Sequence, residues 1–225
     1  MLKKLYIIIF FSLSFSQNIG LITNKSNSAL GIWLGTSLSA DFGADSFNDY
    51  ILDLNYISSS NFEIGIKFES TDLLKFHSNP VVSFSQNYSI LGEFYYHIKS
   101  DDYNGSNFAF GLGSETYKEE YVDSESNFKA ETKHFELIYY KNNKFISLLY
   151  SKTDFFQNPF GFITGSSHSF NRKFLSFGSY YQLFNNIYFF TSYRVNFHVI
   201  DDIIKYKELS YLKNGNFKIS LGIKI

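Results

Sequence analysis

Apolar and polar side chains alternate along much of this chain with a period of two. Between Ile187 and Val199 the odd positions are mostly apolar or aromatic, whereas the even positions include Arg194, Asn196 and His198. Successive side chains of a strand point to opposite faces, so one face of this segment is apolar and the other becomes polar along its length. The pattern predicts a β-strand with two unlike faces.

The same alternation recurs around residues 29–39, 50–57, 62–69 and 217–225. A helical period would scatter these apolar residues around a cylinder, so the repeated period of two favours strands. An aromatic fraction of 20% and only two prolines point the same way. The sequence therefore predicts an all-β chain.

Short polar turns flanked by bulky residues separate many of these strands, as in YISSSNF, YYKNNKF and LFNNIYF. Asn-Gly pairs at 104–105 and 214–215 tolerate positive φ and predict further hairpin turns. The aromatic residues that flank the turns are expected either to form the interfacial girdle of a membrane barrel or to be ordinary cross-strand pairs. The residues concerned are Tyr56, Phe62, Tyr140, Phe145, Tyr211 and Phe217.

Longer connections alternate with the short turns. They are expected at 41–48, 70–80, 117–130, 154–173 and 200–204. Eleven strands can be counted from Ala29 onward, and the segment NIGLIT at 18–23 is a candidate for a twelfth. The expectation is thus an antiparallel transmembrane β-barrel of about twelve strands, with ten possible if one segment counted as a strand is a loop, and with a short final turn at 213–216.

The first residues have the order of an export signal. A short basic start is followed by the apolar run LYIIIFFSLSF and by small residues at Ser14 and Ser16. We expect a signal peptide over 1–16, cleaved before Gln17, and a barrel domain over 17–225. A buried N-terminal strand is the less favoured alternative.

Charge and cysteine content exclude several classes of function. The formal net charge is −1, which gives no basic face for nucleic acid. The chain has no cysteine, which excludes disulfides, a thiol nucleophile and a thiolate metal site. No nucleic-acid partner and no cofactor are expected.

In this pattern the chain resembles the bacterial outer-membrane β-barrel proteins, over essentially all of its length after the signal peptide. Such barrels close with a strand of alternate bulky residues that the assembly machinery recognises, although here the last residue is not aromatic and Ser220 stands where glycine is common. The matching positions are Phe217, Ile219, Leu221, Ile223 and Ile225. The resemblance implies location in the outer membrane of a Gram-negative-type bacterium, with membrane lipids and the barrel-assembly machinery as partners.

A soluble lipocalin-like barrel would show the same alternation with its faces inverted. Small residues at Gly31, Gly35, Ala109, Gly111 and Gly113 lie on the polar faces, where they suit a crowded interior. The apolar faces are nearly free of charge over whole strands, as a hydrocarbon environment requires. Both observations favour lipid on the outside.

Charged residues and histidines on the polar faces are therefore candidates for a lumen lining. They could form the selectivity lining of a narrow polar channel, or a network of salt bridges that simply fills the barrel. The candidates are Asp53, Glu63, Lys67, Glu69, Glu93, His97, Glu115, His134, Glu136, Arg194, His198, Lys218 and Lys224.

Catalysis receives little support from the sequence. Ser167, His168 and Ser169 fall in an expected loop, where a histidine among serines is usually solvated. His134 and Glu136 share one strand face but have no nucleophile at a fixed offset. The histidines are dispersed, so no metal site stands out. We expect no enzyme, although a lipid-modifying outer-membrane enzyme stays the third hypothesis.

The leading functional hypothesis is a passive pore for small polar solutes. The alternative is a structural or surface-binding barrel with a plugged lumen. For that alternative, the acidic loop at 117–130 and the apolar loop at 154–173 are the candidate contact regions, the second as a constriction, a partner site or an extension of the strands.

Overall fold

A computed structural model describes residues 18–23, 27–39, 48–70, 85–100, 107–121, 127–158, 166–196 and 215–225. The expected signal peptide over 1–16 lies outside these residues and stays a prediction. Within the described ranges, no helix is both long and apolar enough to cross a membrane.

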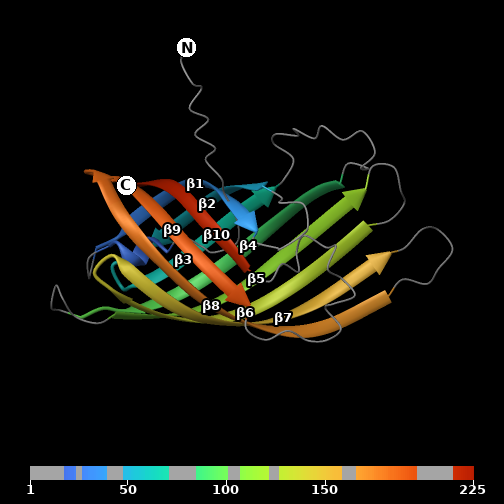
Figure 1. The fold of residues 1–225 in the computed structure, drawn as a ribbon. Coiled ribbons are helices and arrows are strands. Elements are labelled where there is room, and N and C mark those ends of the chain that lie inside the picture. The colour runs from blue at the N-terminus through green and yellow to red at the C-terminus, as the bar shows by residue number, and fades with distance from the viewer. Residues whose placement is uncertain are drawn as a thin grey trace, which may run out of the picture.

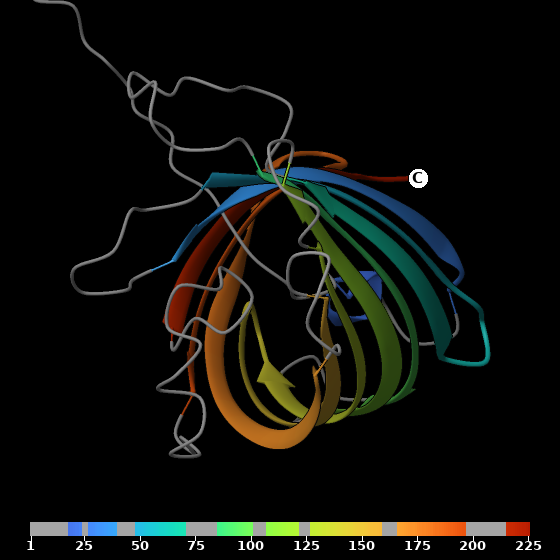
Figure 2. The same ribbon diagram turned by 90° about the vertical axis from the view of Figure 1, so that its right-hand side faces the viewer.

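Ten antiparallel strands form one closed barrel, in which each strand pairs with its sequence neighbours and β1 pairs with β10 (Figures 1 and 2). The predicted fold class is confirmed, with ten strands as the count. The strands are β1 (Ala29–Ser39), β2 (Asn48–Ile57), β3 (Phe62–Ser70), β4 (Ser85–Ile98), β5 (Asn107–Tyr121), β6 (Asn127–Lys141), β7 (Lys144–Asn158), β8 (Ser166–Phe184), β9 (Ile187–Asn196) and β10 (Gly215–Lys224).

Two segments account for the difference between the twelve strands expected and the ten observed. The expected strand at 18–23 is wrong, because this segment forms the short 3₁₀ helix η1 (Ile19–Leu21) inside the barrel. The last strand counted before β10 falls within 197–214, outside the described residues. Since β10 pairs directly with both β9 and β1, the barrel closes without it. The expected short final turn is also wrong, because the connection from β9 to β10 covers 197–214.

Connections alternate between a short-turn end and a long-connection end of the barrel. The connections at the short-turn end join β2 to β3, β4 to β5, β6 to β7 and β8 to β9, and all but the one from β4 to β5 are short turns. Asn61 and Asn142 adopt positive φ values of 65° and 54° in two of them, as the asparagine-rich turn sequences predict. The predicted alternation of short and long connections is confirmed only in part, because the connection from β4 to β5, 99–106, is longer than those from β5 to β6, 122–126, and from β7 to β8, 159–165.

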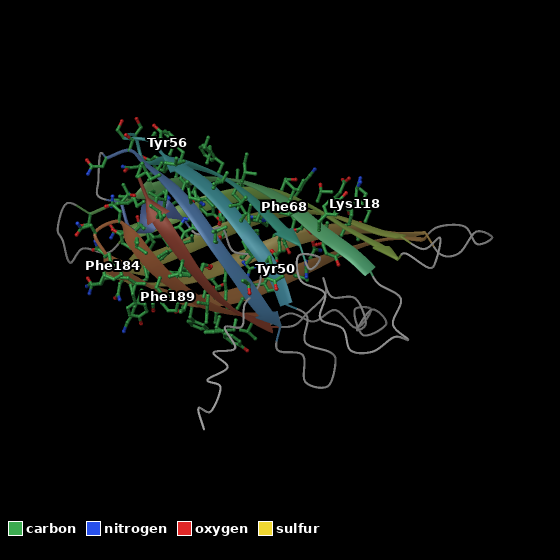
Figure 3. All side chains as sticks on the ribbon, turned by 90° about the horizontal axis from the view of Figure 1, so that it is seen from above. Tyr50, Tyr56, Phe68, Lys118, Phe184 and Phe189 are labelled. Atoms are coloured by element: carbon green, nitrogen blue, oxygen red, sulfur yellow. The ribbon has the colours of Figure 1, made fainter. Side chains whose placement is uncertain are left out.

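The loops expected at 117–130 and 154–173 are largely strand. The β5–β6 ladder continues through the pair Lys118 and Lys129, and the β7–β8 ladder through Asp154 and Ser169. Because the backbone groups of these polar segments pair with one another, β5 to β8 extend toward the long-connection end, and β4 follows β5 as far as its last residue, Tyr121 (Figures 1 and 3).

The barrel is apolar outside and polar inside. Large hydrophobic side chains on the outer face are well exposed, for example 64% for both Leu34 and Ile66, whereas the inward Asp53 and Glu63 are 0% exposed. Figure 3 labels Tyr56, Phe68 and Phe184 on the outside of the ribbon. A water-soluble barrel would need the opposite arrangement, so the exterior is built for lipid.

The expected aromatic girdle is confirmed in part. Tyr56 and Phe62 face outward at the β2–β3 turn. Tyr140 and Phe145, by contrast, are buried inside the barrel, and their assignment to the girdle is wrong. They are direct cross-strand partners whose register puts both rings in the interior. Tyr211 lies outside the described residues.

Small interior residues make room for rings on the neighbouring strand. A Cβ on Gly111 would lie 2.1 Å from Cε1 of Tyr95, and one on Gly222 would lie 2.0 Å from Cε3 of Trp33. In each case the glycine sits directly opposite the ring that covers it. The pairs are Gly111–Tyr95, Gly222–Trp33, Gly113–His134 and Gly178–Phe145.

Candidate functional site

The N-terminal segment Asn18–Thr23, called the plug below, occupies the interior at the short-turn end (Figure 2). The carboxylate of Glu63, at the start of β3, accepts hydrogen bonds from the backbone N–H groups of Ile19 at 2.7 Å and Gly20 at 2.9 Å. The first N–H groups of a helical turn have no acceptor within the turn, so the carboxylate satisfies donors that would otherwise be buried without a partner.

His97, near the end of β4, completes this contact. Its Nε2 lies 2.7 Å from Oε2 of Glu63, and its Nδ1 lies 3.3 Å from the hydroxyl of Tyr140. A Cβ at position 20 would lie 2.3 Å from Nε2 of His97 and 2.7 Å from the Glu63 carboxylate. Position 20 must therefore be glycine for the plug to dock without displacing both side chains.

Three further side chains hold the carbonyl groups of the plug. Lys99 donates to the carbonyl of Thr23 at 2.8 Å, Lys224 to that of Ile22 at 3.4 Å, and Tyr180 to that of Asn18 at 3.5 Å. Burial lowers the pKa of Lys99, which lies just beyond β4, from 10.5 to about 8. The plug is thus fixed by noncovalent contacts that reach it from several sides of the barrel.

An aromatic cluster packs in the interior next to the plug. Trp33 lies 6.1 Å from Tyr180 and 6.5 Å from Phe190 between ring centroids, and Phe145 stacks on Phe190 at 5.8 Å. The Trp33 indole N–H donates to Asn55 at 2.8 Å, whose amide in turn donates to Asp53 at 2.7 Å. Ile19 of the plug belongs to the same buried apolar cluster.

Carboxylates on β4 and β6 are joined by a tyrosine. The Tyr95 hydroxyl lies 2.7 Å from Glu136 and 3.1 Å from Glu93, and Ser147 donates to the other oxygen of Glu136 at 2.6 Å. Nε2 of His134 lies 3.2 Å from Oε1 of Glu93. Each buried carboxylate therefore has polar neighbours, as burial of charge requires.

Cations occupy the opposite side of the interior. The guanidinium groups of Arg172 and Arg194 both lie over the ring of Phe174, at 5.1 and 4.9 Å from its centroid. The ammonium group of Lys218 lies 5.5 Å from the ring centroid of Phe190. Aromatic faces attract such cations where water is excluded.

The interior charges are segregated by sign in the described part of the barrel. An acidic wall lies on β2–β6 and a basic wall on β8–β10, with Lys67 on β3 as the exception. The walls are separated by β1 and β7, whose described inward side chains are uncharged. Arg194 interacts electrostatically with Glu93 and Glu136 across the interior. The acidic wall holds Asp53, Glu63, Glu69, Glu93, Glu115 and Glu136, and the basic wall holds Arg172, Arg194, Lys218 and Lys224.

Most of the predicted lining residues point inward. Ten are no more than 9% exposed as whole residues, His134 and Lys224 are partly buried, and the position of His198 lies outside the described residues. The ten are Asp53, Glu63, Lys67, Glu69, Glu93, His97, Glu115, Glu136, Arg194 and Lys218. Their part in conduction stays a prediction.

Sequence reasoning missed the plug, Arg172, Tyr95 and Lys99. Arg172 fell in a segment interpreted as a loop, although the alternation of β8 continues through it. Tyr95 is an aromatic residue on a polar face, which is a signal for an interior hydroxyl. The plug has no periodic signal, because its contacts come from residues more than 40 positions away.

The expected catalytic candidates are placed differently from the sequence expectation. Ser167, His168 and Ser169 belong to β8 rather than to a loop, and the exposed Ser169 donates a hydrogen bond to Asp154. Among the described residues, no group of three or more His, Cys, Asp or Glu side chains could hold a metal ion.

No protein-family model and no curated protein sequence matches this chain. Among solved structures it is similar to OmpTdeltaL8, a loop L8 deletion mutant of OmpT, an outer membrane protein of Vibrio cholerae, with 12% identity, a TM-score of 0.35 and coverage of 86% of this chain and 62% of that chain. This chain therefore spans less than two thirds of that first relative.

Two further likenesses are of the same kind. Ail, the attachment invasion locus protein of Yersinia pestis, in complex with the heparin analogue sucrose octasulfate, has 11% identity, a TM-score of 0.31 and coverage of 88% of this chain and 97% of that chain. The TodX monoaromatic hydrocarbon channel deltaS2 mutant has 10% identity, a TM-score of 0.33 and coverage of 92% and 70%. At these TM-scores the likenesses are weak, so we assign the class of the protein from the topology and the surface of its own barrel.

A closed antiparallel barrel with an apolar exterior and buried interior charges leaves no unpaired backbone in lipid. The chain is a transmembrane β-barrel of the bacterial outer-membrane type.

Proposed function

We propose that this barrel is a pore for small polar solutes that is closed in the described state and conducts once the plug leaves the short-turn end. The observation that carries the proposal is the mode of closure. The plug is held by hydrogen bonds to Glu63, Lys99, Lys224 and Tyr180, contacts that can break and re-form without a change in the barrel wall.

The segregated interior charges support this role. Burying a charge is costly even when it is paired, and a barrel needed only as a scaffold could fill its interior with apolar side chains. The acidic and basic walls instead provide a polar surface along the interior. Once hydrated, such a surface would favour small charged or polar solutes over apolar ones.

Single-channel conductance of the refolded mature chain in a planar bilayer tests the proposal. The wild-type barrel should be closed for most of the recording. Gly20→Ala should raise the open fraction at least tenfold, because the added Cβ would meet His97 and Glu63 and disfavour the docked plug. Gly92→Ala is the matched control, since a Cβ there meets nothing within 4 Å.

The outcomes separate two kinds of barrel. Openings that appear with Gly20→Ala and not with Gly92→Ala support a plug-gated pore. A Gly20→Ala barrel that folds, releases its plug and still shows no openings would contradict it.

A permanently filled barrel with a structural or surface-binding role is the second candidate. It is favoured by the density of the interior, where Lys67 and Lys218 are only 1% and 0% exposed. Ten strands leave little more space than the eight that side chains can fill completely. A silent barrel after plug release would identify this candidate as the correct one.

A further inference from the structure

A band of lysines follows the apolar belt on the outer face of β5 to β8. The outward row Leu112, Phe135 and Tyr150 consists of direct cross-strand neighbours and ends at Lys173 on β8. One step nearer the long-connection end, the next outward row is Ser114, Lys133, Lys152 and Asn171. On β6 and β7 the outer surface therefore changes from aromatic to cationic within a single step, from Phe135 to Lys133 and from Tyr150 to Lys152.

The lysines of this band are placed opposite one another. Lys133 on β6 is the direct cross-strand partner of Lys152 on β7, and Lys118 on β5 is the partner of Lys129 on β6. Like charges directly opposite each other destabilise a sheet. Figure 3 labels Lys118 on the outer side of these extended strands.

Nearby acids neutralise only part of the band. Lys129 pairs with Glu131 at 2.5 Å, and Lys152 lies 3.9 Å from Asp154. Among the described residues, neither Lys133 nor Lys173 has a recorded ion pair or hydrogen bond. Toward the long-connection end, the described outward positions of the other strands carry no lysine, so among the residues that the structure describes the lysines of this end gather on β5 to β8.

We propose that Lys133, Lys152 and Lys173, called the lysine site below, bind the phosphate groups of lipid headgroups in the leaflet on the long-connection side. Headgroup phosphates lie immediately beyond the hydrocarbon, which is the level at which Lys133 and Lys152 follow Phe135 and Tyr150, and Lys173 lies beside Tyr150 at the same boundary. A phosphate between two opposed ammonium groups converts their repulsion into two charge-assisted hydrogen bonds. The aromatic rings below would contact the acyl chains of the same lipid.

This site is independent of the plug and of conduction, because all three lysines are on the outer face. It fits a membrane lipid better than a dissolved anion, since the cationic surface is continuous with the lipid-facing belt. Asn171, which accepts a hydrogen bond from Tyr150 at 2.9 Å, holds that ring at the boundary between the two surfaces.

The test uses the full mature chain in nanodiscs of phosphatidylcholine with increasing amounts of phosphatidic acid, and native mass spectrometry to measure retained phosphatidic acid. The double variant Lys133→Gln with Lys152→Gln should weaken retention about tenfold or more. The matched control is Lys141→Gln with Lys144→Gln. These two lysines are also direct partners on β6 and β7, but lie at the short-turn end.

Near-wild-type retention by the control, together with loss in the first double variant, supports the site. Equal loss in both double variants would mean general surface charge and would overturn it, as would no loss in either. Competition with inorganic phosphate distinguishes the source of the ligand. Displacement of the lipid by millimolar free phosphate would indicate a site for a dissolved anion and would overturn the lipid assignment.

Discussion

The backbone N–H of Gly20 donates a hydrogen bond to the Glu63 carboxylate at 2.9 Å, across 43 residues of sequence. This contact joins the plug, which lies inside the barrel and is not part of its wall, to the start of β3. It makes the interior at the short-turn end a docking site for a piece of the same chain.

Release of the plug should be visible in the fluorescence of Trp33, which is the only tryptophan of the chain. Trp33 is 0% exposed and shares an apolar cluster with Ile19. In Gly20→Ala we expect a red-shifted emission and faster acrylamide quenching, because water reaches the ring when Ile19 leaves. Gly92→Ala should leave the spectrum unchanged, and an unshifted spectrum in Gly20→Ala would mean that the plug tolerates the extra methyl group.

Docking of the plug should strengthen with rising pH above about 8. Burial lowers the pKa of Lys99 to about 8 from 10.5, so the undocked state binds the Lys99 proton more tightly than the docked state. Protonation therefore favours undocking, and the docked state gains stability as the pH rises from about 8 to about 10.5. Acrylamide quenching of Trp33 should decrease over that interval in the wild type.

The Lys99→Met variant is the control for this pH dependence. It keeps an apolar stem without a titrating group, so its quenching should be flat over the same interval. A wild-type profile as flat as that of the variant would show that Lys99 does not control docking.

Arg194 should affect the ion selectivity of the open barrel. In a Gly20→Ala background, Arg194→Gln removes a cation from the basic wall, so the reversal potential in a salt gradient should shift toward cation selectivity. Lys173→Gln removes a cation from the outer face of the barrel and serves as the control. The same reversal potential in both variants would contradict a lining role for Arg194.

The contact between Gly111 and Tyr95 should be sensitive to a single methyl group. A Cβ at position 111 would lie 2.1 Å from the buried Tyr95 ring, which the Glu136 hydrogen bond holds in place. Gly111→Ala should lower the free energy of unfolding by about 1–3 kcal/mol, measured by urea titration in lipid. Gly92→Ala, on the outer face, should change it by less than about 0.5 kcal/mol.

The position of the lipid boundary on β5 can be measured with two arginine substitutions. Leu112 is 60% exposed on the outer face, and Ser114 is the next outward residue toward the long-connection end. Leu112→Arg should cost about 2–4 kcal/mol of folding free energy in bilayers, and Ser114→Arg about 0–1 kcal/mol. Similar costs at the two positions would place the boundary elsewhere.

The alternation of apolar and polar side chains in the sequence by itself determined much of the fold. It predicted the strands and their two faces, and with the short asparagine turns it predicted an antiparallel barrel. Inward glycines such as Gly111 were recognisable as small residues on polar faces. These features are local, because strand period and turn conformation depend on residues close together in the sequence.

Tertiary structure alone decided the number of strands, the direction of Tyr140 and Phe145, and the fate of residues 18–23. A strand of a closed barrel needs backbone partners on both sides, whereas the backbone of the plug finds its acceptor in the side chain of Glu63. The separation of acidic and basic walls likewise depends on which strands are neighbours around the closed barrel. The sequence determines which side chains lie on each face of a strand. Closure of the barrel decides which side chains of other strands they contact.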